Sequence, residues 1–141
     1  MKMDKNQKGF SLIELLLVAV IIMVLSSIAV PYLMSAVGAA ENGSVFASLK
    51  TFSSSQVNYY TANGRYARLD ELNAAENNRL GTTVGSDVQR GIYTFTMSPA
   101  APTDTQLRDN FTVIASKASN YHNQPYVISL DASGQITQIF P

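Results

Sequence analysis

The sequence predicts an α+β fold in which one long amino-terminal helix packs on a four-stranded antiparallel β-meander. Two observations predict it. Residues 11–62 follow a helical pattern that is apolar up to position 40 and amphipathic beyond it. After position 90, four short runs alternate apolar with polar residues, and loops separate them. A half-apolar sheet needs a cover, and the amphipathic part of the long helix can supply one.

Composition narrows the classes of function. The 141 residues hold ten Lys plus Arg and ten Asp plus Glu, and this zero net charge argues against a dedicated nucleic-acid-binding protein. The chain has no Cys, which excludes disulfides, thiolate metal sites and cysteine nucleophiles. Charged residues make up 14% of the chain, against roughly 25% in ordinary soluble domains. The deficit is concentrated near the amino terminus.

A basic segment and a long apolar segment open the chain. Residues 1–9 carry three lysines and one aspartate, and residues 15–40 are 26 positions without a charge. About 20 helical residues cross a ~30 Å hydrocarbon core, so this run can span a bilayer. The preceding lysines predict that this end stays in the cytoplasm. On hydropathy alone, a secretory signal peptide cleaved near Ala39 is the alternative.

The residues at the start of the apolar run form a specific pattern. Residues 8–15 read Lys-Gly-Phe-Ser-Leu-Ile-Glu-Leu. An acidic residue within an apolar segment is costly in a membrane, which makes Glu14 a functional candidate. Together with Pro31, 17 positions later, this pattern resembles the type IV prepilin family. That family has a basic leader ending in Gly, then Phe, Ser or Thr, two apolar residues and Glu before an apolar helix.

The resemblance, which covers about 30 residues of the chain, implies how the protein is processed and organised. A prepilin peptidase would cut between Gly9 and Phe10 on the cytoplasmic side and methylate the new amino group of Phe10. Residues 1–9 would be a cleaved leader, and residues 10–38 a transmembrane and filament-core helix. Residues 39–141 would form a globular pilin head that includes the amphipathic half of the long helix.

The resemblance also implies roles for two residues of the helix. Glu14 would pair with the Phe10 amino group of a neighbouring subunit, which would compensate the burial of its carboxylate and set the register of the filament. The alternative is that the Glu14 carboxylate extends to the lipid headgroups. Pro31 would break the helix because it lacks a backbone donor, as a kink in one chain or as a locally melted segment in a filament.

The residue pattern in the second half of the long helix predicts which face of that helix packs on the head. Its apolar and aromatic residues recur at helical spacing, and Asn63-Gly64 is a stop signal. Aromatic residues at such spacing favour packing over an electron path. The stripe consists of Val45, Phe46, Leu49, Phe52, Gln56, Tyr59 and Tyr60.

The head is expected to hold a short helix and four strands. The helix is expected over 69–80 and a polar loop over 81–91. A hairpin turn at residues 131–134 is expected to place Gly134 at positive φ. The predicted strands are 91–97, 110–116, 125–130 and 135–140, with loops over 98–108 and 117–124.

No local motif supports catalysis, so the chain is expected not to be an enzyme and to hold no cofactor. The major pseudopilin of type II secretion, a class related to the family that the sequence resembles, typically binds calcium in a carboxy-terminal acidic loop. Here Asp104, Asp109 and Asp131 are dispersed, and no metal site is expected. The single histidine, His122, stands in a polar segment and is expected to be exposed.

By resemblance, the expected function is that of a structural subunit of a type IV pilus. The implied partners are copies of the same chain, the prepilin peptidase, an inner-membrane platform with its motor ATPase, and membrane lipid before assembly; no nucleic acid is implied. The subunit would lie in the bacterial inner membrane and then on the cell surface. The alternatives are a pseudopilin of a type II secretion piston and, from another class, a membrane-anchored periplasmic binding domain.

Overall fold

The structure is a computed structural model that describes residues 9–117 and 126–140. It divides into two compact units, residues 1–41 and 42–141. The helices and strands are α1 (Leu12–Asn63), α2 (Leu69–Ala75), β1 (Thr82–Val84), β2 (Asp87–Arg90), β3 (Tyr93–Met97), α3 (Gln106–Asp109), β4 (Thr112–Lys117), β5 (Val127–Asp131) and β6 (Ile136–Phe140).

In the first unit, α1 is continuous through Pro31. Proline has no N–H to donate to the carbonyl of Ser27, four residues earlier, so one bond of the helical ladder is missing there. The Ser27 hydroxyl donates to the Val24 carbonyl at 2.7 Å. The helix continues through Pro31, which is compatible with a kink in the single chain, and the predicted kink or local melting in a filament stays a prediction.

The end of α1 confirms the predicted stop signal. Gly64 has φ +70°, and its N–H donates to the Tyr60 carbonyl at 2.8 Å. A residue with a side chain rarely adopts this left-handed conformation, and glycine does so without steric cost. The helix therefore ends at Asn63, within one residue of the expected position.

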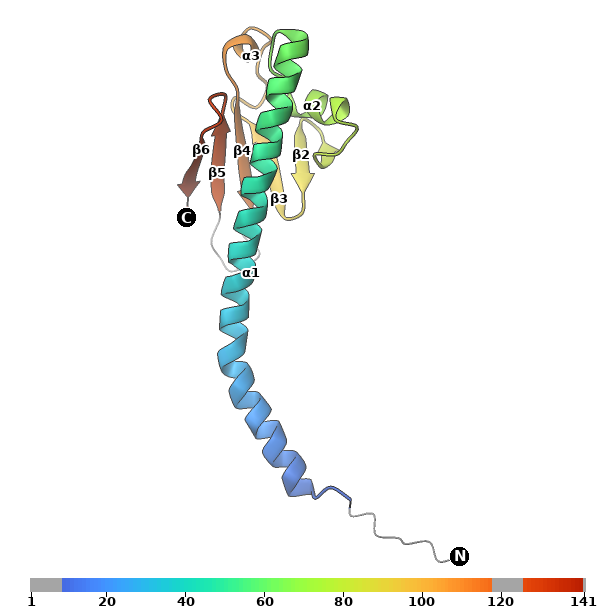
Figure 1. Cartoon of the computed structure of the whole chain (residues 1–141), viewed down its shortest axis with the longest axis vertical. Helices are drawn as coiled ribbons and strands as arrows, with labels where there is room; N and C mark the ends of the chain where they lie inside the picture. Colours follow the sequence, from blue (N-terminus) through green and yellow to red (C-terminus); the bar gives the residue numbers. More distant parts are fainter. Residues whose placement is uncertain (1–8, 118–125, 141) are drawn as a thin grey trace, which may run out of the picture. The chain divides into compact units, whose positions relative to one another are not determined.

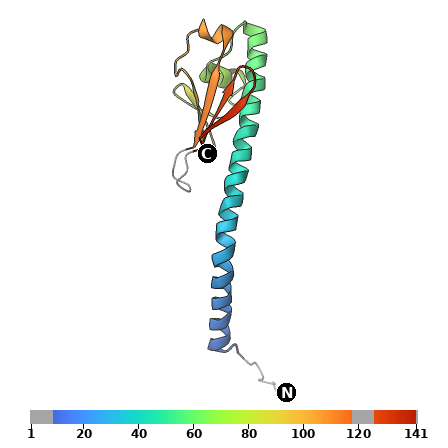
Figure 2. The ribbon, with the colours of Figure 1, turned by 90° about the vertical axis from the view of Figure 1, so that its left-hand side faces the viewer.

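The second unit is a two-layer head. The part of α1 that belongs to this unit lies across one face of the sheet (Figure 1), and the view turned by 90° separates the helix layer from the sheet layer (Figure 2). The six strands found in the described residues are antiparallel neighbours in chain order, which makes the sheet a meander. The α+β prediction is thereby confirmed, with six described strands instead of the expected four.

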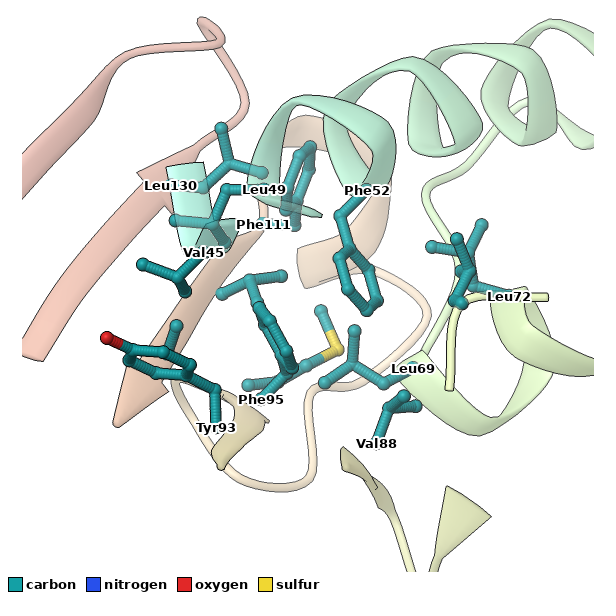
Figure 3. Close-up of a cluster of buried hydrophobic side chains, with 14 of the residues drawn as sticks. Val45, Leu49, Phe52, Leu69, Leu72, Val88, Tyr93, Phe95, Phe111 and Leu130 are labelled. Carbon is teal, nitrogen blue, oxygen red and sulfur yellow. The ribbon is translucent and has the colours of Figure 1, made fainter. Parts of the chain in front are cut away.

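The core forms between the inner face of the sheet and one stripe of α1. The Phe52 and Phe95 rings stack with centroids 4.7 Å apart, and Leu69 and Leu72 of α2 pack at one side of them (Figure 3). Of the predicted stripe, four residues are buried, Phe46 and Tyr59 are half-buried, and Tyr60 is exposed. The buried members are Val45, Leu49, Phe52 and Gln56.

The alternation predicted for two central strands is also confirmed. Tyr93, Phe95 and Met97 of β3 are buried, and their polar neighbours face outward. Val113 and Ala115 of β4 are buried in the same way. These residues pair across the strands, Phe95 with Ala115 and Met97 with Val113, so one row of side chains continues under the helix.

The polar loop predicted over 81–91 is wrong, because this segment forms the hairpin β1–β2. Only Val88 of the hairpin is buried, so the apolar alternation that identifies a strand is missing from its sequence. Gly81 packs so close to the Gln89 carbonyl that a Cβ there would overlap it. Gly85 adopts φ +65° at the turn. These glycines serve a tight turn and a close backbone approach, which a loop assignment overlooks.

A buried side chain of α2 holds the start of this hairpin. Asn73 donates to the Gly81 carbonyl at 2.9 Å and to the Thr83 hydroxyl at 2.8 Å. Its oxygen accepts the Leu80 N–H at 3.1 Å. The amide thereby satisfies backbone groups that lie outside any helix or sheet ladder. Local sequence carries no signal for this tertiary arrangement.

Other boundaries differ from expectation. The helix predicted over 69–80 ends at Ala75, because Asn77 and Asn78 adopt positive φ. The loop predicted over 98–108 contains the short helix α3. Strands β3 to β6 begin one or two residues after their predicted starts. The predicted exposure of His122 and most of the 117–124 loop fall outside the described residues.

The turn between β5 and β6 has the predicted form. Gly134 has φ +80°. The Asp131 carboxylate accepts the backbone N–H groups of Ser133 at 2.9 Å and of Gln135 at 3.1 Å. A hydrogen bond from the Ser133 hydroxyl is the main cause that lowers the pKa of Asp131. The carboxylate is therefore committed to the hairpin turn.

An ion cluster ties α2 to its surroundings in the head. The Glu71 carboxylate accepts hydrogen bonds from the two terminal guanidinium nitrogens of Arg65, at 2.9 and 3.1 Å. It also accepts one from the Arg68 backbone N–H at 3.1 Å. Arg68 in turn donates to Asp104 at 2.6 Å and to the Pro102 carbonyl. A bidentate guanidinium pair fixes geometry as well as charge. The cluster thus joins the end of α1, the start of α2 and the segment before α3.

The buried Gln56 side chain supports the first prediction. Its amide donates to the Ala67 carbonyl and accepts the Ala67 N–H, both at 2.8 Å. Gln56→Leu leaves two buried backbone groups unpaired, so we expect a loss of about 2–4 kcal/mol in the free energy of unfolding. Denaturant unfolding of the full chain in detergent measures it. The exposed Asn58→Leu on the same helix is the control, and an equal effect of both variants would contradict the assignment.

The Glu71 cluster gives a prediction of pH dependence. The hydrogen bond from Arg65 lowers the pKa of Glu71 from its ordinary 4.5. A lowered pKa means that the pair stabilises the head above pH 4.5 and loses this contribution as pH falls through the folded-state value. We expect Glu71→Gln to cost at most about 1 kcal/mol near pH 7 and less at pH ~3, and both costs are small because the pair is partly exposed. Unfolding curves at both values test this, and a constant difference would refute it.

Candidate functional site: the amino-terminal segment

The predicted cleavage residues lie just before α1. Gly9, Phe10 and Ser11 are outside any helix or strand, and α1 begins at Leu12. Apart from its chain neighbours, no described residue lies within 4 Å of the position that a Gly9 side chain would occupy, and Phe10 is 88% exposed. Residues 9–11 are therefore non-helical, and no described part of the chain covers Gly9 or Phe10. This geometry suits a protease, which needs its substrate backbone free of helical hydrogen bonds.

Glu14 lies in the first turn of α1 and is exposed. Its Oε2 accepts the backbone N–H of Ser11 at 2.9 Å, and the Leu15 N–H donates to the Ser11 carbonyl at 3.2 Å. Ser11 is therefore the residue that caps the helix, and Glu14 stands three positions on. This contact was not predicted from the sequence, although Ser-x-x-Glu before an apolar run is its known signal.

The surface of α1 after Glu14 is apolar on every side. The consecutive residues Leu15, Leu16, Leu17 and Val18 are each more than half exposed. Successive positions differ by about 100° around a helix, so four of them cover its whole circumference. A helix that is apolar all round is one that is buried in lipid or among other helices. Within the described part of the chain, α1 is the one helix long and apolar enough to cross a membrane.

The dispersed aspartates have local partners or remain apart. Asp104 pairs with Arg68, and the Asp131 carboxylate is held by its own turn. Across residues 9–117 and 126–140, no three acidic, histidine or cysteine side chains gather where they could hold a metal ion.

The fold and this segment define a class of protein. A long helix with an apolar front half and a head of antiparallel sheet form the pilin fold. The family described as the prokaryotic N-terminal methylation motif matches residues 4–30. The chain therefore carries the amino-terminal signature of the type IV pilin and pseudopilin superfamily. No curated protein matches the sequence.

Members of this superfamily are structural subunits. In general they are processed by a prepilin peptidase and assemble with copies of themselves. The exposed apolar surface of α1 and the motif both fit anchoring in a membrane before assembly.

Proposed function

We propose that the protein is a structural subunit of a type IV pilus filament. One observation carries the proposal: the front half of α1 is apolar around its full circumference and exposed in the single chain. Such a surface is far larger than soluble monomers leave in contact with water. Lipid covers it before assembly, and equivalent helices of neighbouring subunits cover it afterwards.

Processing at the Gly9–Phe10 bond is the first step of the proposed pathway. Hydrolysis removes residues 1–9 with their three lysines and leaves seven basic and nine acidic residues in the mature chain. It also creates a free amino group on Phe10, which the same peptidase methylates. The apolar helix stays attached, so the mature subunit remains in the membrane until it is assembled.

Transfer from lipid into the filament costs little hydrophobic free energy. Lipid tails are as apolar as leucine side chains, so the helix exchanges one apolar surrounding for another. Close packing and paired polar groups must then provide the preference for the filament. Along the first turns of α1, Glu14 is the only charged side chain that can do so.

Pairing of Glu14 with the Phe10 amino group of a neighbouring subunit supplies that preference. An unpaired charge in an apolar surrounding is very costly, and a close opposite charge recovers much of that cost. A subunit in the wrong register would leave both groups unpaired, so the pair also selects the register. The break predicted at Pro31 would let the helix adapt within the filament. The Ser27 carbonyl already lacks its helical donor in the single chain, because Pro31 has no N–H.

A pseudopilin of a type II secretion system is the second candidate, since it shares the same signature and fold. Asp104 forms an ion pair with Arg68, and the Asp131 carboxylate accepts a backbone hydrogen bond within its own turn. These local partners favour the pilus subunit over a subunit with an acidic calcium loop. In either case, an inner-membrane platform and a motor ATPase would drive assembly.

The first test of the proposal concerns the cleavage site. Gly9→Glu places a charged side chain at the residue before the scissile bond, and we expect complete loss of processing. An electrophoretic band of the uncleaved precursor in membranes would report it. Gly9→Ala is the control with a minimal side chain, and normal maturation of Gly9→Glu would refute the assigned site.

The second test concerns the ion pair. Glu14→Ala removes the carboxylate, and we expect the processed subunit to stay in the membrane with filament yield reduced at least tenfold. Filaments sheared from the cell surface and quantified against membrane-bound subunit give the yield. Glu41→Ala, outside the first turns of the helix, is the matched control. A wild-type yield from Glu14→Ala would end the pairing hypothesis.

The intact mass of the chain recovered from sheared surface filaments tests the function as a whole. A chain that begins at Phe10 and is one methyl group heavier would support processing, methylation and surface assembly together. The same chain found only in membranes would favour the pseudopilin. A chain that begins near Glu41 or retains Met1 would contradict both.

A further inference from the structure

We infer that Glu14 has two successive partners, and that the backbone N–H of Ser11 is the first of them. In the uncleaved subunit this N–H holds the carboxylate beside the place where cleavage will create the Phe10 amino group. Ser11 is thus a positioning residue for assembly. The inference rests on the proposed function, because the second partner is the amino group of the filament pair.

The contact is specific in geometry. The Ser11 N–H to Glu14 Oε2 distance is 2.9 Å, which is ideal for an amide donor and a carboxylate acceptor. The first N–H groups of any α-helix lack partners within the helix, and a carboxylate three residues after the cap can reach back to one of them. The positive end of the helix dipole favours the same placement of a negative charge.

Before cleavage, the proposed ion pair cannot form. The nitrogen of Phe10 then belongs to the Gly9–Phe10 peptide bond and carries no charge. A carboxylate at the start of an apolar helix would lack a strong partner, which is costly. The Ser11 N–H supplies one from the same chain, so the precursor can remain in the membrane without a second subunit. Ser27 follows the same pattern farther along α1, where its hydroxyl donates to the Val24 carbonyl.

After cleavage, a partner of opposite charge becomes available to Glu14 on a neighbouring subunit. Hydrolysis converts the Phe10 nitrogen into an ammonium group. The Ser11 amide is neutral, whereas an ammonium adds the attraction between opposite charges, which is strong in a low-dielectric surrounding, so the ammonium displaces the Ser11 amide. Cleavage therefore changes the preferred partner of Glu14 from an amide of its own chain to an ammonium group of a neighbouring subunit.

Hydrogen exchange of the uncleaved full chain isolates the first partner, because the Phe10 amino group does not exist there. The chain is produced without the peptidase, placed in zwitterionic detergent micelles, and the exchange of the Ser11 N–H with water is measured by NMR. Glu14→Gln keeps an acceptor oxygen without the charge, and Glu14→Ala removes the acceptor. We expect protection in the wild type and in Glu14→Gln, and about fivefold faster exchange in Glu14→Ala, as for loss of a typical helix cap.

Equal exchange of the Ser11 N–H in all three chains would overturn the inference. Filament yield in cells that contain the peptidase separates this result from the proposed function. Glu14→Gln cannot form an ion pair, so it should protect Ser11 in the precursor and still assemble poorly. Wild-type filament yield from Glu14→Gln would refute the ion pair while leaving the Ser11 contact in place. Ser11→Ala keeps the backbone N–H and is the control that should preserve protection by Glu14.

Discussion

The front half of α1 presents apolar side chains in every direction, and they are exposed in the part of the chain that the structure describes. The rest of the architecture is compatible with this constraint. A helix satisfies its own backbone hydrogen bonds, so it is one of the few structures that lipid accepts. The same surface fits a subunit that lipid or copies of the chain cover. Membrane anchoring and self-assembly are thus two solutions to one physical problem.

The second half of the same helix meets a different requirement. From Val45 to Gln56 only one stripe is buried, and the opposite side is polar. That stripe closes the core over β3, β4 and β5, so the helix carries the head as well as the anchor. The chain has no disulfide to secure its carboxy-terminal segment. Strand pairing, the Asp131 turn and the Glu71 cluster hold the elements of the head together.

At three places in the described residues, a polar side chain satisfies backbone groups that would otherwise lack partners. Gln56 and Asn73 each bind backbone groups that no helix or strand would otherwise pair. Ser11 and Glu14 do the same at the start of α1. An unpaired buried group costs more than a typical hydrogen bond contributes, so such contacts specify the fold more than they stabilise it. At Glu14 the contact also involves the residue on which the proposed assembly depends.

The sequence by itself determined the long helix, its end at Gly64, the α+β class and the inward faces of β3 and β4. Each has a local cause, because period, glycine conformation and charge are properties of neighbouring residues. The amino-terminal motif could be read for the same reason. Only the tertiary structure decided that residues 82–90 form a hairpin, since Thr82–Val84 has no buried face and depends on Asn73 of another element. It also revealed the Ser11–Glu14 contact that our sequence analysis overlooked, and the path of α1 through Pro31. These features depend on the geometry of particular atoms. A residue pattern can indicate such a contact, but it does not determine the positions of the atoms.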